Sequence, residues 1–336
     1  MTVYPELFRG NIMMSRIRLA RNVFDCPFYL TDISEAREIV KKVDLSLVKC
    51  GSFNLYYVKN LSDTKLEALK EKHLISSKLI KNRQCGAVLI SADKSVSVMI
   101  GEEDVLREQC FMRGLSLMEA YKKLDQIDDE ISKNLDVAYS EKFGYLTACA
   151  TNLGTGLRAS VMLFLPALTE SGKIKELILS AREAGLAVRG VYGEGSIAEG
   201  YVYQISNERT LGVKEQTVIR EVSETVEKIC ELEREESERL YGKRKIETMD
   251  RAHKSFGILT NAVTLSYGEF LEHIAFVKLG AMLGFMNINE LEAIDDLIVS
   301  VRPAILAEDY GRKLSVTDEK ILRAEKVKRT LLKIKE

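Results

Sequence analysis

Short runs rich in Val, Ile, Tyr and Phe recur through the first 212 residues of the chain. Such runs are typical of β-strands. The three-residue link Ala92–Lys94 between two of them suits a tight hairpin, so we expect much of the sheet to be antiparallel. The predicted strands are Phe53–Lys59, Gly86–Ser91, Val96–Ile100, Val105–Met112, Arg158–Pro166, Ala187–Tyr192 and Tyr201–Ser206.

Apolar residues at spacings of three and four flank these strands and predict helices over Asp32–Lys42, Leu115–Leu135 and Thr169–Ala184. From Lys214 the pattern is helical to the C-terminus. The fold class is therefore α+β: a largely antiparallel sheet flanked by helices in residues 1–212, followed by a helical C-terminal domain in residues 213–336.

The start of that second region carries a helical apolar stripe. It is followed by ELEREESERLYGKRK (residues 231–245), in which the sign of the charge alternates. We expect this run to be a solvated helix face with ion pairs four residues apart, which is far commoner than a nucleic-acid-binding patch. The stripe consists of Val218, Val222, Val226, Ile229 and Leu232.

Composition narrows the functional classes. The chain has 336 residues, 46% of them hydrophobic, and a net charge of −1, so no global field favours nucleic acid or membrane. The first ten residues lack the apolar segment of a signal peptide, and no apolar run reaches membrane-spanning length. Six scattered cysteines without a CxxC pair, and three histidines, argue against a zinc site or a disulfide scaffold. These features predict a cytoplasmic protein.

Five arginines form the main chemical signal. The motif SRIRLARN places Arg16 and Arg18 two apart, so in an extended segment both side chains point to the same side. Guanidinium groups bind phosphate oxygens in pairs. Arg107, Arg158 and Arg189 are expected in strands or at strand ends, the last two beside glycines that permit close backbone approach to a ligand. Each fits a surface arginine taken alone, whereas together they suggest an anion site.

Carboxylates accompany these arginines. An acidic turn, residues 102–104, precedes Arg107, and Glu194 follows Arg189. An acid beside an anion-binding arginine is unexpected unless it binds a cation or accepts a proton. The alternative is a set of solvated turn carboxylates.

The stretch TACATNLGTGLRASVM carries Cys149, which is either a buried small hydrophobe or a thiolate activated by nearby arginine. Within it, GTGLRA matches a dinucleotide-binding pattern but leads into a strand rather than a helix, so we discount it. The chain contains no GxxxxGK[ST] motif and no HRD and DFG pair, which excludes P-loop NTPases and ordinary protein kinases.

Taken in order, these motifs resemble the ATP:guanido phosphotransferases, the family of creatine and arginine kinases. The matching runs are SRIRLARN, EKHLIS, EEDVLR, TACATNLGTGLRASVM, VRGVYGEG and QISNERTLG. Two C-terminal runs, DRAHKSFGILTNA and YGRKLSVTDEKILRAEKVKR, are similar to the bacterial protein-arginine kinase branch of the family. The resemblance covers most of the chain.

The resemblance implies an ATP-dependent protein-arginine kinase that acts in protein quality control, Clp protease targeting and stress-repressor control. It implies ATP with Mg²⁺ held mainly by the nucleotide, so no metal site of the protein's own. The implied partners are proteins with exposed arginine, an McsA-like activator, a Clp ATPase and a second copy of the chain, but neither nucleic acid nor membrane. The alternatives are a kinase for a small guanidino compound and a catalytically weakened adaptor of the same fold.

By position in the family motifs, Glu103 is the catalytic base, Glu194 the second carboxylate that holds the acceptor guanidinium, and Cys149 the reactive cysteine beside it. His73 is expected near the adenine. The implied nucleotide-binding residues are Ser15, Arg16, Ile17, Arg18, Leu19, His73, Arg107, Arg158, Ala159, Ser160, Val161, Met162, Arg189, Gly190, Val191, Tyr192, Gly193 and Glu194.

The chain departs from the family pattern at three places. Gly101 and Val105 stand where the family has Asn and His in NEEDH, and Ala150 replaces a proline. In the C-terminal region, EKILRA (residues 319–324) replaces the RDxxRA motif that binds phosphoarginine in the protein-arginine kinases. We therefore expect the regulatory phosphoarginine pocket to be weakened or absent.

Overall fold

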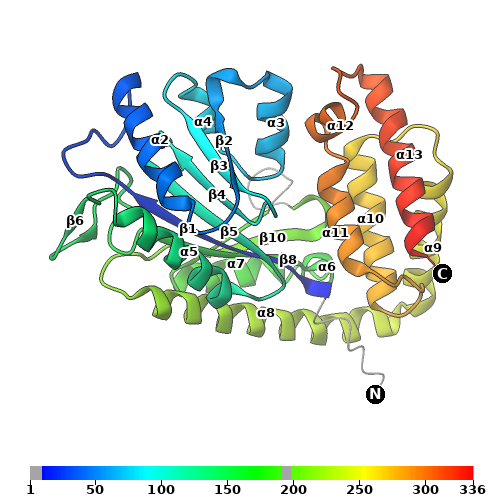
Figure 1. Cartoon of the computed structure of the whole chain (residues 1–336). Coiled ribbons are helices and arrows are strands. Elements are labelled where there is room, and N and C mark those ends of the chain that lie inside the picture. The colour runs from blue at the N-terminus through cyan, green and yellow to red at the C-terminus, as the bar shows by residue number, and fades with distance from the viewer. Residues whose placement is uncertain (1–9, 191–197, 336) are drawn as a thin grey trace. The chain divides into compact units, whose positions relative to one another are not determined.

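A computed structural model describes residues 10–190 and 198–335. It contains one large sheet flanked by helices (Figure 1). The sheet has eight strands in the order β2-β3-β4-β5-β1-β8-β10-β9, and a separate hairpin is formed by β6 and β7. The strands are β1 Ile12–Arg21, β2 Phe53–Tyr57, β3 Ala87–Ser91, β4 Val96–Ile100, β5 Leu106–Arg113, β6 Tyr139–Ser140, β7 Gly144–Tyr145, β8 Leu157–Phe164, β9 Leu186–Gly190 and β10 Val202–Asn207.

The pairing along β2-β3-β4-β5-β1 is antiparallel at every step. The predicted hairpin is confirmed: β3 and β4 pair antiparallel, joined by residues 92–95, and Lys94 adopts the left-handed conformation that such a turn needs. The expected fold class, a largely antiparallel sheet with helices and a helical C-terminal region, is thus confirmed.

Helices cover this sheet and make up the C-terminal region. The described helices are α2 Ile33–Leu47, α3 Asp63–Glu71, α4 Ser77–Lys81, α5 Leu117–Ser132, α6 Pro166–Glu170, α7 Ile174–Glu183, α8 Glu215–Lys243, α9 Lys245–Asn261, α10 Tyr267–Met282, α11 Leu291–Ser300, α12 Pro303–Asp309 and α13 Val316–Ile334, with short 3₁₀ turns η1 Val58–Asn60 and η2 Glu199–Tyr201.

One predicted helix is wrong as a single element. Residues 169–184 form the end of α6 and all of α7, with a break at Gly172, whose φ of 78° is left-handed. A regular α-helix does not continue through that conformation, so the segment forms two short helices. Helices α3 and α4 were not predicted. They pack Leu66, Leu69 and Leu79 against strand residues of β3 and β4.

The long helix α8 follows the predicted stripe only in part. Four of the five stripe residues are buried, but Leu232 is 47% exposed and the adjacent Glu233 is fully buried. Glu233 accepts hydrogen bonds from the backbone N–H groups of Ala167 and Leu168, at 2.7 and 2.9 Å, and so caps the start of α6. The charged run is therefore not solvated throughout, because Glu233 is buried as a helix cap. The expected ion pair four residues apart is present between Arg234 and Glu238, at 2.9 Å.

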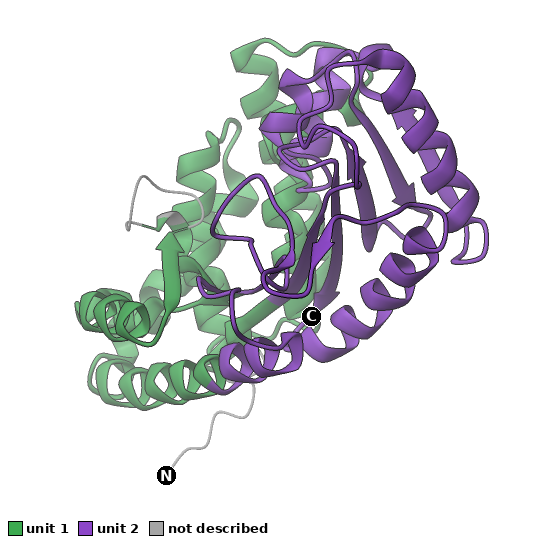
Figure 2. Ribbon diagram, turned by 90° about the vertical axis from the view of Figure 1, so that its left-hand side faces the viewer, with its two compact units in different colours: residues 1–13, 162–205, 225–336 green, residues 14–161, 206–224 purple. Residues whose placement is uncertain are grey.

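Two compact units divide the described chain (Figure 2). One comprises residues 14–161 and 206–224, and contains β2–β5, α2–α5 and the β6–β7 hairpin. The other comprises residues 1–13, 162–205 and 225–336, and its core packs side chains of α9, α10, α11 and α13 together. We call them the sheet unit and the helical unit. A functional boundary after residue 212 stays a prediction.

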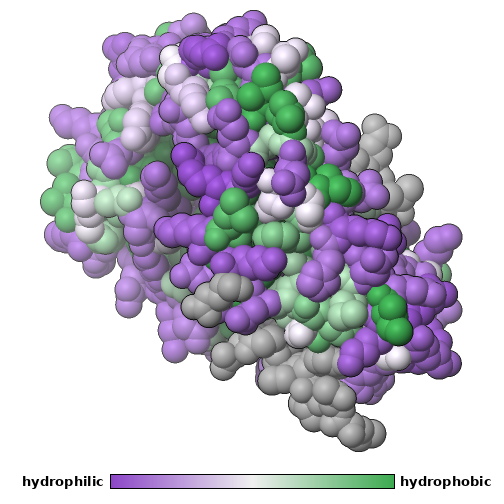
Figure 3. All heavy atoms as spheres, turned by 90° about the vertical axis from the view of Figure 1, so that its right-hand side faces the viewer, coloured by the Kyte–Doolittle hydropathy of each residue, from purple (hydrophilic) through white to green (hydrophobic). Residues whose placement is uncertain are grey.

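Hydrophilic side chains dominate the face that carries the C-terminal helices, with apolar side chains gathered in small patches (Figure 3). Ile246 on α9 and Val263 just beyond it are 76% and 78% exposed. Within residues 10–190 and 198–335, every helix is too short or too polar to cross a bilayer.

Gly154 provides a test of the tight backbone packing in the sheet unit. Its φ is 111°, and a Cβ there would lie 2.3 Å from the Thr210 carbonyl oxygen. Gly154→Ala should therefore cost about 3 kcal/mol in the free energy of unfolding, measured by urea denaturation. Gly114→Ala, at φ 63° with no heavy atom within 4 Å of the added Cβ, should cost only about 1 kcal/mol. Equal losses would show that the contact with Thr210 is unimportant.

Candidate functional site

Strand β1 presents two of the predicted arginines on one side of the sheet. Arg16 and Arg18 are half-buried, whereas Ile17 and Leu19 between and beside them are fully buried in the core. The register with β5 sets Arg18 opposite Gln109 and Ala20 opposite Arg107. The period of two in a strand accounts for this separation of arginines from core residues.

Arg158 on β8 joins this group. Its Nη2 donates to Ser206 Oγ at 3.2 Å, and Arg16 Nε donates to Ser160 Oγ at 3.4 Å. Burial, followed by the charges of Arg107 and Arg158, lowers the pKa of Arg16 to about 10. Burial, followed by Arg16, Arg107 and Arg158, lowers the pKa of Arg18 well below its ordinary value. The four guanidinium groups are thus close enough to repel one another.

An anion would relieve this repulsion. Among the described residues, Arg18 Nε is buried without a hydrogen-bond acceptor. Glu102 is a carboxylate bound to the cluster, since it accepts from Arg107 Nη1. Four clustered guanidiniums with a buried orphan donor fit the phosphates of a nucleotide, whose oxygens accept several charge-assisted hydrogen bonds at once.

The acidic turn before Arg107 is held by two asparagines. Asn22 Nδ2 donates to Asp104 Oδ1 at 2.8 Å, and Asn22 Oδ1 accepts from the Val105 N–H at 2.8 Å. Asn82 Nδ2 donates to the Gly101 carbonyl at 3.0 Å. Sequence reasoning missed both asparagines. The available signal was Asn22 itself, a polar residue that directly follows SRIRLAR at the end of β1.

Burial assigns different roles to the three acids of this turn. Glu102 and Asp104 are 1% and 3% exposed, and both are engaged: Glu102 with Arg107 and the Glu103 N–H, Asp104 with Asn22 and the Ala148 N–H. The Glu103 side chain is 27% exposed and pairs with Lys78 Nζ at 2.5 Å. Glu103 is therefore the carboxylate of this turn that a ligand can reach.

Cys149 lies in a loop closed by the bridge between Tyr145 and Gly154. Its Sγ is 3.0 Å from Thr151 Oγ1, and the side chain is half-buried. The loop is ordered by backbone turns, since the Asn152 N–H donates to the Cys149 carbonyl at 2.9 Å. Asp104 reaches the same loop through the Ala148 N–H at 2.6 Å, which ties the acidic turn to the cysteine.

Thr210 secures this loop from the far side. Its Oγ1 donates to the carbonyls of Thr151 and Leu153, at 3.1 and 2.8 Å. Thr210 is buried, and it comes from the motif QISNERTLG at the end of β10. That motif contributed no residue to the predicted site, so Thr210 is a positioning residue that sequence reasoning missed.

Several other residues of the sheet unit that were predicted to bind the nucleotide make structural contacts. Ser15 Oγ donates to the Gly114 carbonyl at 2.7 Å, and the Ala159 N–H donates to Asn207 Oδ1 at 2.8 Å. Val161 is buried in the core. His73 has a left-handed φ of 59°, and its carbonyl accepts from Gln109 Nε2 at 2.7 Å.

Other predicted residues fall in the helical unit or outside the description. Met162 is half-buried and packs against the cluster around Phe164. Arg189 is exposed near the end of β9, and Gly190 ends that strand. Val191, Tyr192, Gly193 and Glu194 lie outside the described residues.

Arg323, in the run EKILRA, is fully buried in the helical unit. Its Nε and Nη1 donate to the carbonyls of Val301 and Leu265, at 2.9 and 3.0 Å, and its Nη2 donates to Glu319. This arginine is thus engaged in linking α13 to neighbouring segments. In the described part of the chain, no three His, Cys, Asp or Glu side chains gather closely enough to hold a metal ion.

Two family models match the chain. The ATP:guanido phosphotransferase C-terminal catalytic domain matches residues 35–236, and the protein-arginine kinase McsB C-terminal domain matches residues 245–336. The chain is 42% identical over 328 residues to a protein-arginine kinase of Caldanaerobacter subterraneus subsp. tengcongensis, covering 96% of this chain and 97% of the relative. It is also 42% identical over 327 residues to a protein-arginine kinase of Clostridium acetobutylicum, covering 95% and 96%.

Solved structures agree on the fold. The duplicated taurocyamine kinase of Schistosoma mansoni superposes with a TM-score of 0.60 at 28% identity, covering 68% of this chain and 34% of that one. A lombricine kinase superposes with a TM-score of 0.59 at 24% identity, covering 67% and 66%, and so supports the fold alone. The family models and the near full-length relatives show that this chain belongs to the ATP:guanido phosphotransferase family, among the members that carry the McsB C-terminal domain.

Proposed function

We propose that this chain is an ATP-dependent protein-arginine kinase, which transfers the γ-phosphoryl group of ATP to arginine side chains of proteins. The observation that carries the proposal is the four-arginine cluster beside an acidic turn in which Glu103 is the accessible carboxylate. Relatives named protein-arginine kinases that match over nearly the whole chain support the acceptor class.

The arginine cluster would bind the nucleotide. Arg16, Arg18, Arg107 and Arg158 neutralise the phosphates and stabilise the charge that spreads over the transferred group. Mg²⁺ bound with the nucleotide would supply further charge neutralisation. Arg189 and His73 stay predicted nucleotide-binding residues from their places in the family motifs.

The acceptor poses the harder chemical problem. A guanidinium is protonated and delocalised at neutral pH, so it is a poor nucleophile until it loses a proton. Glu103 accepts that proton as the nitrogen–phosphorus bond forms and the bond to the ADP oxygen breaks. Lys78 Nζ forms an ion pair with Glu103 Oε2 at 2.5 Å, and the acceptor guanidinium would replace Lys78 in this pair. Glu194 and Cys149 are proposed to hold the acceptor from its other sides.

The cellular role is also part of the proposal. The kinase would act in the cytoplasm on proteins with exposed arginine, in quality control, Clp-dependent degradation and control of stress repressors. An McsA-like activator, a Clp ATPase and a second copy of the chain are its proposed partners. The match to the McsB C-terminal domain over residues 245–336 supports this reading over a kinase for a small guanidino compound.

Glu103→Gln tests the base. The variant keeps the shape and one acceptor oxygen but cannot take a proton, so phosphoarginine formation should fall by at least about 100-fold. The measurement is incubation with ATP, Mg²⁺ and an unfolded arginine-rich protein, followed by mass spectrometry that preserves acid-labile phosphoarginine. Glu119→Gln, an exposed change on α5, is the control. Full activity in Glu103→Gln would refute the assignment.

Arg18→Gln tests the anion site. Removing one half-buried guanidinium should weaken ATP binding by at least about tenfold while relieving the repulsion felt by Arg16, so the apoprotein should be no less stable. Titration calorimetry and thermal denaturation measure the two effects. The matched control is Arg37→Gln on the exposed face of α2. Unchanged ATP affinity would remove Arg18 from the site.

Free phosphoarginine tests the regulatory pocket. Because Arg323 is buried and already engaged with Glu319 and two carbonyls, millimolar phosphoarginine should leave kinase activity and oligomeric state unchanged. Kinase assays and light scattering across a titration check this, with inorganic phosphate as the control. Activation or a change in oligomer size at micromolar phosphoarginine would contradict it.

A further inference from the structure

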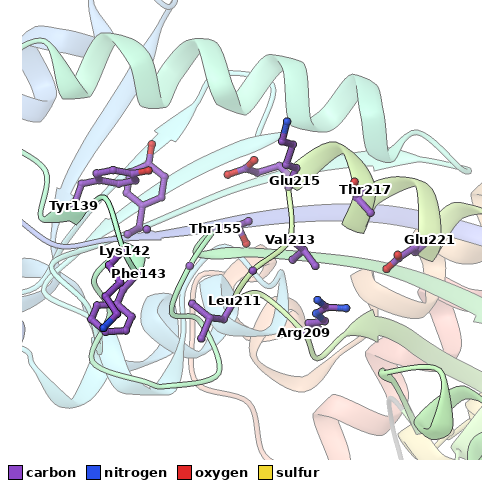
Figure 4. A pocket seen from close by; sticks show the side chains of 15 residues that line it. Tyr139, Lys142, Phe143, Thr155, Arg209, Leu211, Val213, Glu215, Thr217 and Glu221 are labelled. Atoms are coloured by element: carbon purple, nitrogen blue, oxygen red, sulfur yellow. The ribbon is translucent and has the colours of Figure 1, made fainter.

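A cavity of about 740 Å³ opens in the sheet unit beside the Cys149 loop (Figure 4). The β6–β7 hairpin forms one wall and the segment leading into α8 forms the other. The hairpin contributes Tyr139 and Phe143, and the second segment contributes Leu211 and Val213. None of these side chains has a place in the kinase chemistry described above.

The floor of the cavity and the base of the Cys149 loop are the same backbone. A Cβ on Gly144 would lie 2.5 Å from the Gly154 carbonyl oxygen, so the backbone at Gly144 and the backbone at Gly154 are in direct contact. Gly154 lines the cavity and is five residues after Cys149, a stretch that spans at most about 18 Å when fully extended. A molecule in the cavity therefore lies within reach of the acceptor side of the site.

The walls combine apolar and charged surface. Tyr139, Phe143 and Leu211 are 57%, 43% and 46% exposed, and Tyr139 is held in place by edge-to-face packing on Tyr145 at 5.3 Å between ring centroids. Preformed exposed aromatic and aliphatic side chains are the usual core of a docking surface. The charged lining residues are Lys142, Arg209, Lys214, Glu215 and Glu221.

We propose that this cavity docks the extended polypeptide that flanks the acceptor arginine of a substrate protein. An apolar residue of that segment packs on Phe143 and Leu211. An acidic residue pairs with the basic side chains, which outnumber the acidic ones in the lining by three to two. An extended chain advances about 3.3 Å per residue, so these two residues lie within about six positions of the arginine. The inference rests on the proposed function, because it assigns a docking surface to that same reaction.

The proposal is tested with two single-arginine peptides and the full chain. One is a twelve-residue peptide with a leucine and a glutamate three to five positions from the arginine on each side. The other is a capped Gly-Arg-Gly peptide. Leu211→Ser and Lys214→Glu should each raise the KM for the long peptide about tenfold, or about 1.4 kcal/mol, and leave kcat and the KM for the short peptide unchanged. Leu45→Ser, 61% exposed on α2, is the matched control.

A second measurement keeps docking separate from catalysis. Fluorescence anisotropy follows a labelled twelve-residue peptide in which lysine replaces the arginine. If neither peptide is phosphorylated but the labelled peptide binds and Leu211→Ser weakens it tenfold, the proposed function fails and the docking surface stands. If both peptides are phosphorylated with equal KM and the variants change nothing, docking is overturned and the function stands. Equal KM increases for both peptides also overturn it, because they indicate damage to the Cys149 loop.

Discussion

Electrostatic repulsion among four clustered arginines is the constraint on which the sheet unit depends. Burial and mutual charge lower the pKa of Arg16 and Arg18, so holding these groups together costs free energy in the absence of an anion. The packing and pairing of neighbouring strands in one sheet offset that free energy. Ile17 and Leu19 anchor β1 in the core, and its register with β5 fixes Arg107 beside it. The cluster is therefore preorganised for the polyphosphate that we propose it binds, and a preorganised site stabilises transferred charge without rearranging at the moment of reaction.

The same ten-residue strand uses its third arginine for a different purpose. Arg21 lies on the opposite face from Arg16 and Arg18, as the period of two requires, and is 2% exposed. It donates to both carboxylate oxygens of Asp128, at 3.0 and 3.2 Å through Nε, and to the Thr155 carbonyl at 3.1 Å. Its guanidinium stacks 3.5 Å from the centre of the Tyr145 ring. Arg21 thus joins the end of β1 to α5 and to the base of the Cys149 loop, so the proposed phosphate-binding side and the proposed acceptor side share one support.

Sequence alone predicted what depends on local pattern. The strand Val96–Ile100 matches β4 residue for residue, and the alternation rule placed Arg16 and Arg18 on one side. It could not predict features set by tertiary contacts. Leu232 belongs to the predicted apolar stripe but is exposed, whereas the adjacent Glu233 is buried and its carboxylate caps α6. Likewise, the choice of Glu103 among three adjacent acids came from family resemblance. The physical reason, that its two neighbours are buried and engaged, is visible only in the fold.

The two departures from the family pattern in the acidic turn, Gly101 and Val105, lie at positions whose role in the turn depends on the backbone rather than on the side chain. Gly101 has a φ of 80°, a conformation that glycine adopts without strain and that asparagine tolerates better than most residues. Val105 is fully buried, and its contribution to the turn is an N–H that donates to Asn22. Neither replacement removes a hydrogen bond that the turn makes through its backbone. Glu103 consequently keeps its exposure and its position beside the arginine cluster, which favours an active kinase over an adaptor that has lost its chemistry.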